Sequence, residues 1–459
     1  MATNSQPETE RSDRGATGWE QAARSPKATI FSVGCPLAAF LMPLKLSLAY
    51  AVLAPLIVLW LVSAVTASHR AALTSQERRV LVPVAFFLVT CALSLCVGVS
   101  FRNGLPSLIS LAFFAGTIVV FLRHAPLAQT ASAVLAGQSI SAVHSVLESA
   151  FPAAVPELFQ GKVTEAGQLA VTTVMAIGLM WHYAQQDRSR MHARSCIAAG
   201  CVLAVALTSL GFHQQLALQP AALAALIGFT ALLFLWLIRR SLRSSGAAQR
   251  VALLASVQAP LLVSALLLNL KRGPWLGVLA GCAVFFAFYA RRVLGALLGA
   301  SAFAVVALAP VRERIAASYE HFTIPGGRST MWRMALDLAS EYPLGIGYHN
   351  SGIIRQLAPE IPQELKHFHN NALNILAEMG WIGLALFAWF IVALLRCSFA
   401  HRRDILAVSA GCAFISWQAA GLVEYNIGDS EVLIIVWMLV GSLLCSIRER
   451  QRPVVAGAA

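Results

Sequence analysis

One histidine of this sequence lies where a general base would be useful. His369 lies in the run Lys366–Asn371, which comes directly before a long apolar stretch, so we place it at the water-facing mouth of a membrane helix. An imidazole, with a reference pKa near about 6.5, can accept the proton of an attacking hydroxyl. The alternative is an interfacial histidine that only hydrogen-bonds a loop carbonyl.

Two arginines are suited to holding an anion. Arg272 occupies a tight turn between two apolar stretches, and Arg328 follows two glycines at the start of a predicted helix. A guanidinium stays protonated and offers bidentate donors to a phosphate or pyrophosphate, and a helix N-terminus adds backbone donors. The alternative for each is an arginine that faces only solvent or lipid headgroups.

The elements that must position these side chains are membrane helices. Of 459 residues, 58% are hydrophobic and 12% charged, with a mean hydropathy of +0.69, whereas soluble domains carry roughly 25% charged residues. Apolar runs of about 17 to 23 residues suit helices that cross a hydrocarbon core of about 30 Å, and barrel strands would instead alternate over about 10 residues. We therefore predict an all-α polytopic membrane protein with about 12, up to 14, transmembrane helices.

The candidate spans cover most of the chain. They lie near residues 29–44, 46–66, 80–98, 104–122, 127–147, 166–183, 195–211, 219–238, 251–269, 275–290, 293–309, 373–395, 405–423 and 431–447. The first pair is split by Pro43, and a short or re-entrant hairpin there would lower the count to about 12.

Arginine placement predicts the orientation. Arginine-rich connections alternate along the chain, at 78–79, 188–194, 239–250, 291–292, 402–403 and 448–452. The positive-inside rule makes these connections and both termini cytoplasmic. Acidic residues mark opposite connections: Glu148, Glu157 and Glu165 in one, and Glu424, Asp429 and Glu431 in another. We expect an inner-membrane protein, and the family resemblance described below implies a Gram-negative cell.

The predicted organisation has five parts. A disordered cytoplasmic tail (1–28) precedes the N-terminal helices (29–309), a periplasmic loop (310–372), the last three helices (373–447) and a cytoplasmic tail (448–459). The loop is too long to lack structure. We predict a helix over Arg328–Tyr342 that ends before Pro343, and a shorter one near Ile353–Leu357 interrupted by Pro359 and Pro362. Both are expected to be amphipathic, to lie over the membrane surface and to cap a cavity.

Other partners are disfavoured. The net charge of +13 is dispersed between apolar runs rather than gathered on one face, so we expect no nucleic-acid partner. The nine cysteines lie in or beside apolar runs without metal-pair spacing, so neither a disulfide framework nor a zinc site is expected. The outer connections carry no Asp-x-Asp pair, which favours arginine over a metal as the pyrophosphate ligand.

Three sequence features together resemble the O-antigen ligase and polymerase superfamily. They are Arg272-Gly-Pro-Trp275; Arg328-x-x-x-Trp332 followed by Pro343-Leu-Gly345-Ile-Gly347; and His369-Asn-x-x-Leu373 followed by Gly380-x-x-Gly383-Leu384. The motifs span about residues 250 to 395, and the layout of the whole chain also agrees. No single motif is specific, whereas their order on one side of the membrane is.

The resemblance implies a reaction. A ligase of this family transfers a glycan from undecaprenyl pyrophosphate to a sugar hydroxyl of the lipid A core, with inversion and without a nucleotide sugar, metal or other cofactor. On this chain His369 would activate the acceptor, and Arg272 and Arg328 would bind the pyrophosphate. Secondary candidates are His367, Trp332, Tyr348 and Asn370. The expected partners are the lipid-linked donor, the lipid A core and membrane lipids.

Two other functions remain open. A polymerase or a protein O-oligosaccharyltransferase of the same superfamily differs mainly in its acceptor, and the large loop before the last three spans favours a ligase or an oligosaccharyltransferase over a polymerase. A transporter or flippase is the alternative of another class. Transporters usually carry ionisable residues deep in their spans and an internal repeat, and this sequence shows few such residues and no convincing repeat.

Overall fold

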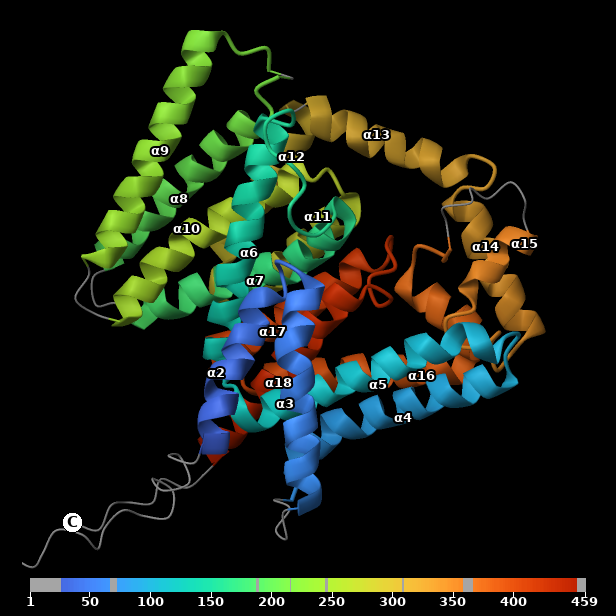
Figure 1. Cartoon of the computed structure of the whole chain (residues 1–459). Helices are drawn as coiled ribbons and strands as arrows, with labels where there is room; N and C mark the ends of the chain where they lie inside the picture. The colour runs from blue at the N-terminus through green and yellow to red at the C-terminus, as the bar shows by residue number, and fades with distance from the viewer. Residues whose placement is uncertain are drawn as a thin grey trace, which may run out of the picture.

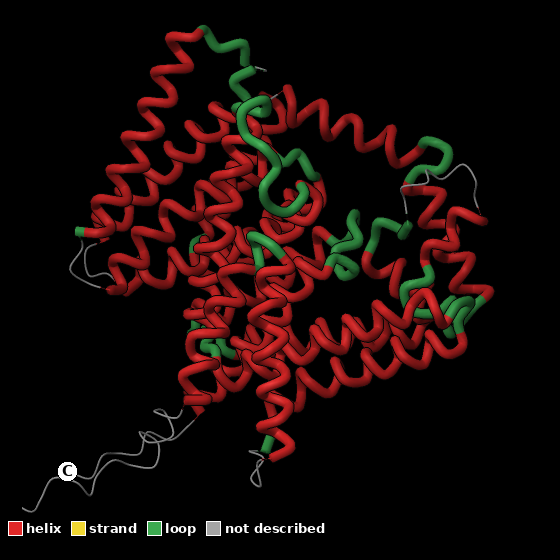
Figure 2. The backbone as a smooth tube through the Cα atoms, viewed as in Figure 1, coloured by secondary structure: helices red, strands yellow, loops and turns green. Residues whose placement is uncertain are grey.

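The computed structural model describes residues 26–66, 72–186, 190–214, 216–243, 247–307, 309–357 and 366–451. Over these ranges every regular element is a helix (Figures 1 and 2). The helices are α2 Pro26–Leu41, α3 Leu46–Thr66, α4 Ser75–Val97, α5 Phe101–His124, α6 Leu127–Ala150, α7 Lys162–Gln186, α8 Arg190–Gly211, α9 Pro220–Leu242, α10 Ala247–Leu268, α11 Arg272–Tyr289, α12 Arg291–Ala307, α13 Ala309–Thr323, α14 Arg328–Glu341, η1 Ser351–Ile353, α15 Ile354–Leu357, α16 Asn371–Ala400, α17 Ile405–Ala420 and α18 Ser430–Gln451.

The predicted all-α class is confirmed for these residues, and each predicted span coincides with a helix. Eight helices of the described chain are long and apolar enough to cross a membrane, or nine if α12 and α13 form one bent span. The chain is therefore a multi-pass membrane protein, while the count of 12 to 14 stays a prediction. Of the predicted N-terminal tail (1–28), residues 1–25 lie outside the described residues. The last three residues of that predicted tail belong to α2, which begins at Pro26.

The core lies around the C-terminal helices. α7 and α18 are almost wholly buried, α17 packs against both α7 and α11, and α18 packs against α5. Glycines allow the closest approach, because a side chain at Gly277 or Gly281 would meet the carbonyls of Ser416 or Cys412 in α17. By contrast α9 leaves most of its apolar surface exposed, as expected for a helix that faces lipid (Figure 1).

The segment predicted to be an outer loop, residues 310–372, contains more helix than the sequence indicated. α14 matches the predicted helix, and η1 with α15 matches the shorter one. Pro359 and Pro362 lie outside the described residues. α13 was not predicted, although it fills almost the first quarter of the segment predicted to be a loop. With 15 residues and several charged side chains, α13 is too short and too polar to be recognised as an apolar span.

Helix α16 is interrupted in a way the sequence analysis did not anticipate. Gly380 has a φ of 68° and a ψ of −169°, a conformation that essentially only glycine adopts. The break leaves the carbonyls of Ala377 and Glu378 without helical partners. They accept hydrogen bonds of 2.9 Å from the N–H groups of Ile346 and Gly347 instead. The Pro343–Gly347 motif thus runs beside the broken helix and completes it.

The carboxylate beside this break fixes the next stretch of loop. Glu378 is fully buried, and its Oε1 accepts a hydrogen bond of 3.1 Å from the backbone N–H of Ser351. The Ser351 hydroxyl in turn donates to the carbonyl of Lys366 over 2.9 Å. Through these contacts the break in α16 holds both the 345–351 segment and the start of the run that contains His369.

Candidate active site

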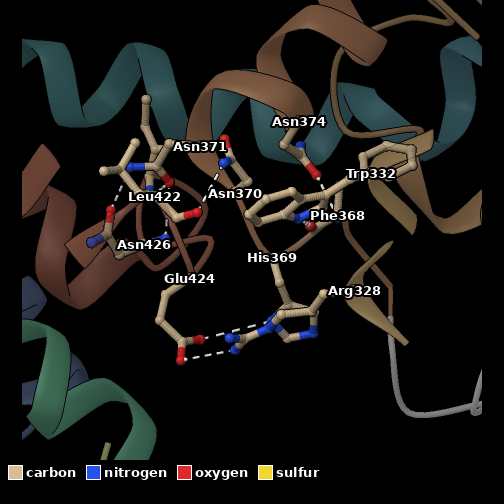
Figure 3. A network of polar contacts seen from close by, with 11 residues as sticks. Arg328, Trp332, Phe368, His369, Asn370, Asn371, Asn374, Leu422, Glu424 and Asn426 are labelled. Atoms are coloured by element: carbon tan, nitrogen blue, oxygen red, sulfur yellow. Dashed lines mark hydrogen bonds and ion pairs between the residues drawn. The ribbon is translucent and has the colours of Figure 1, made fainter. Parts of the chain in front are cut away.

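The polar run before α16 is held in one conformation by Asn370. Its Oδ1 caps the helix by accepting from the Leu373 N–H over 3.0 Å, and its Nδ2 donates to the Leu422 carbonyl over 2.8 Å (Figure 3). The preceding residue, His369, has a φ of 48°, a value that non-glycine residues adopt rarely. The conformation of His369 is therefore imposed by its neighbours.

Asn371 holds the connection between α17 and α18, residues 421–429, against the start of α16. Its backbone N–H donates to the Gly421 carbonyl over 2.7 Å, and its Oδ1 accepts from the N–H groups of Asn426 and Ile427. Its Nδ2 also donates to the Asn426 Oδ1 over 2.7 Å. Because buried polar groups are costly to leave unpaired, this cluster fixes the connection firmly. Glu424 lies in the connection that these hydrogen bonds hold in place.

Glu424 joins two of the predicted site residues. Its Oε1 lies 3.4 Å from Nη2 of Arg328, and its Oε2 lies 3.7 Å from Nδ1 of His369 (Figure 3). Burial acts to raise the pKa of this carboxyl, but the His369 contact and the charges of Arg328 and Lys271 outweigh burial and lower it. Glu424 is therefore an anion at neutral pH. The separation from His369 is an ion-pair distance, longer than a hydrogen bond.

Arg328 reaches the site because α14 is docked at its base. Arg328 is the first residue of that helix, and one turn later the Trp332 indole N–H donates to the Phe368 carbonyl over 3.0 Å. The Phe368 N–H is in turn held by Asn374 Oδ1 over 3.2 Å. The indole of Trp332 thus has a structural role: it ties the helix that carries Arg328 to the residue before His369.

Arg272 lies at the same end of the molecule. It is the first residue of α11, and its Nη1 is buried without a hydrogen-bond partner among the described residues. It is close enough to Arg314 and Arg328 to be repelled by both, and to Glu424 to be attracted. A half-buried guanidinium whose Nη1 is buried and unpaired, and which lies among like charges, is an arrangement that suits an anionic ligand.

The helix missed by the sequence analysis contributes to this cluster. Arg314, on α13, donates from Nε to the Leu270 carbonyl over 3.0 Å. Leu270 has a φ of 56° in the turn that precedes Arg272. α13 therefore supplies a third arginine and supports the turn that presents Arg272.

A cavity of about 100 Å³ opens beside these residues. His367, His369, Glu424 and Lys271 line its polar side. The rings of His367 and His369 are 4.3 Å apart, edge to face. Burial, followed by the nearby His369, lowers the pKa of His367 to about 4, so this ring is neutral at physiological pH. His367 acts as a neutral wall of the cavity.

The other secondary candidate is placed elsewhere. Tyr348 lines a second cavity of about 120 Å³, together with His349, Ser107 and Ser430, and its N–H donates to Ser94 Oγ over 3.2 Å. No group of three or more His, Cys, Asp or Glu side chains is arranged to hold a metal ion in the described part of the chain.

Sequence reasoning missed Glu424, Glu378 and Arg314 as parts of this end of the molecule. Glu424 was used only as an acidic marker of the outer side, and its neighbours in sequence give no hint of His369, which is 55 residues away. The sequence did contain a signal for Glu378. A carboxylate inside an apolar stretch is energetically costly, and this one is followed two residues later by Gly380.

Comparison with known proteins covers the middle of this region. Residues 259–388 match the O-antigen ligase family model. The resemblance read from Arg272, Arg328 and His369 is thereby confirmed for this segment, which contains all three and ends before Glu424. A relative from Rickettsia bellii (strain RML369-C), named "Putative polysaccharide ligase", is 27% identical over 125 residues. These residues are 25% of this chain and 29% of that protein, so the similarity spans less than a third of its length.

Proposed function

We propose that this chain is an O-antigen ligase that transfers a polysaccharide from undecaprenyl pyrophosphate to a sugar hydroxyl of the lipid A core. The observation that carries the proposal is the contact of one carboxylate, Glu424, with both Arg328 and His369 beside a cavity at the head of a membrane helix. The contacts of Glu424 bring a cation for the leaving group and a base for the acceptor into one site.

The donor pyrophosphate would bind at the arginine end. Arg272 offers open donors, Arg328 offers those not used by Glu424, and Arg314 adds positive charge. The polyprenyl tail would lie against lipid-facing helices. As the glycosyl bond breaks, its electron pair passes to the pyrophosphate oxygen, and the guanidinium groups stabilise the charge that develops there. No nucleotide sugar, metal or other cofactor enters this scheme.

The acceptor would be activated by His369. Its Nδ1 faces Glu424, which leaves Nε2 to take the proton of the acceptor hydroxyl. The acceptor oxygen then forms the new bond to the anomeric carbon on the face opposite the pyrophosphate, with inversion. Glu424 would stabilise the imidazolium that results, as a carboxylate does for a base histidine in hydrolases.

The orientation belongs to the same proposal. The arginine-rich connections support an orientation in which both termini would lie in the cytoplasm and the loop over 310–372 would lie in the periplasm of a Gram-negative cell. α13, α14 and α15 would then cover the cavity from outside, where both substrates present their headgroups. The five-part division of the chain rests on this orientation.

Reconstitution tests the proposal. Purified protein in liposomes should release undecaprenyl pyrophosphate and form glycosylated lipopolysaccharide when given a lipid-linked glycan and rough lipopolysaccharide. Two matched controls use the donor alone and the donor with a protein acceptor. Elongated lipid-linked glycan from donor alone would identify a polymerase, and glycosylated protein would identify an oligosaccharyltransferase. Movement of donor across the bilayer without any transfer would refute glycosyl transfer.

A further inference from the structure

A third cavity lies near the end of α16 that is remote from His369. It has a volume of about 300 Å³ and lies between α4 and α16, which pack side by side (Figure 1). Its lining includes Gln76 and Arg79 of α4 and Trp389, Ala393, Arg396 and Cys397 of α16. The four α16 residues recur at helical spacing, so one face of the helix forms one wall.

Two arginines flank this groove with their charges open. Arg79 and Arg396 are both exposed, and neither forms an ion pair within the described residues. Nearby acids are already engaged: Glu77 lies 3.3 Å from Arg448, and Asp404 pairs with Arg450. The groove therefore presents two positive charges that have no counter-ion among the residues the structure describes.

The remaining wall is apolar and continues along the helices. Trp389 and Val392 are about half exposed, and the Trp389 ring lies 6.2 Å from that of Phe86, which is also exposed. In a multi-pass membrane protein an exposed aromatic and aliphatic strip of this kind faces acyl chains rather than water. The groove thus has a cationic end at the membrane boundary and an apolar strip that extends into the hydrocarbon.

We propose that this groove binds an anionic phospholipid of the adjacent leaflet. The headgroup phosphate would lie between Arg79 and Arg396, with Gln76 as a neutral donor, and one acyl chain would lie along Trp389 and Phe86. Guanidinium pairs hold phosphate well, and basic pockets between membrane helices recognise anionic lipids. A zwitterionic headgroup would instead bring its own cation towards the two arginines.

This site is separate from the proposed active site, since it lies near the opposite end of a helix of 30 residues. The bound lipid would bridge the ends of α4 and α16, where the described residues show one direct polar contact, from Cys397 Sγ to Gln76 Oε1 over 3.8 Å. The inference is independent of glycosyl transfer, and its test uses no activity measurement.

The test uses Trp389 as a reporter in the full-length protein. The protein is placed in phosphatidylcholine vesicles that contain phosphatidylglycerol, with bromine on the acyl chains of one lipid or the other at equal bromine content. The Trp389 signal is obtained by subtracting the fluorescence of Trp389→Phe. Brominated phosphatidylglycerol should quench this signal more than brominated phosphatidylcholine.

Matched variants decide whether the two arginines cause the preference. Arg79→Gln and Arg396→Gln should each lower the relative affinity for phosphatidylglycerol about fivefold. Arg396→Glu should reverse the preference. Arg78→Gln removes an exposed arginine that does not line the groove, and it should leave the preference unchanged. Equal quenching by both lipids in the wild type, or an equal loss in Arg78→Gln, would overturn the proposal.

Discussion

The two ends of α16 are held in different ways. At the end that begins the helix, Asn370, Asn371 and Glu378 form buried hydrogen bonds with two separate connections. At the other end the helix meets α4 mainly through apolar and aromatic side chains such as Trp389 and Phe86. Directional bonds fix the position of individual atoms, whereas apolar packing fixes only the position of the helix. The polar network lies at the end of α16 that carries His369, the proposed base.

The comparison is tested most strongly by removing that histidine. General-base assistance contributes about 10²- to 10⁴-fold, so His369→Ala should lower ligation by that order while donor binding persists. Ligation is measured with reconstituted protein, and donor binding with labelled lipid-linked glycan. Trp389→Phe, at the other end of the same helix, should leave the rate near the wild-type value. A wild-type rate in His369→Ala would remove the base from the account.

A smaller loss of activity is expected when Arg328 is replaced by lysine, which keeps the positive charge but lacks the planar guanidinium. Arg328→Lys removes the forked donors that match pyrophosphate, and hydrogen bonds to charged groups contribute roughly 1.5 to 3 kcal/mol, which is about 10- to 10²-fold in rate. The apparent affinity for the donor should fall together with the rate. Chelator should leave the wild-type rate unchanged. Strict dependence on magnesium or manganese would show that arginine does not replace a metal.

The break in α16 predicts a stability difference between two glycine substitutions. In Gly380→Ala the new methyl would meet the Pro343 carbonyl, and the residue has a positive φ, so unfolding should become easier by about 2 kcal/mol. Gly295→Ala is the control, because that helical glycine has open space around it and alanine favours helix. Thermal unfolding in detergent should give a lower midpoint for the first variant only. Equal midpoints would mean that the break is not required.

The burial of His367 also predicts how stability depends on pH. The folded state holds the pKa of His367 at about 4, below the unfolded value near 6.5, so the unfolded chain binds more protons between these values. Stability should therefore rise as pH increases from about 4 to 6.5 and then level off. His367→Asn should flatten this part of the profile, measured as unfolding midpoint against pH. A profile identical to that of the wild type would show that His367 is not buried as a neutral group.

The sequence predicted the helices well and the site only in part. Long apolar runs identify spans because lipid demands them, and α14 was found because Pro343 and its glycines end it. α13 was missed because its residues are too polar for a span. The contact between Glu424 and His369 depends on Asn371 latching a connection about 50 residues later in the chain, and no local pattern encodes such a contact. Motif order could supply Arg272, Arg328 and His369, but not the carboxylate that joins two of them.

The central claim is that Glu424 acts on the reaction through His369, and a double-mutant cycle tests it most directly. Ligation rates are measured for the wild type, Glu424→Gln, His369→Ala and the double variant, with folding checked by the unfolding midpoint of each. Glu424→Gln alone should lower the rate about 10- to 10²-fold, because it removes a charged partner. In the His369→Ala background the same change should add less than about threefold, since residues that work as a unit are not additive. If the two losses multiplied in full, Glu424 and His369 would act independently, and the proposed site would be contradicted.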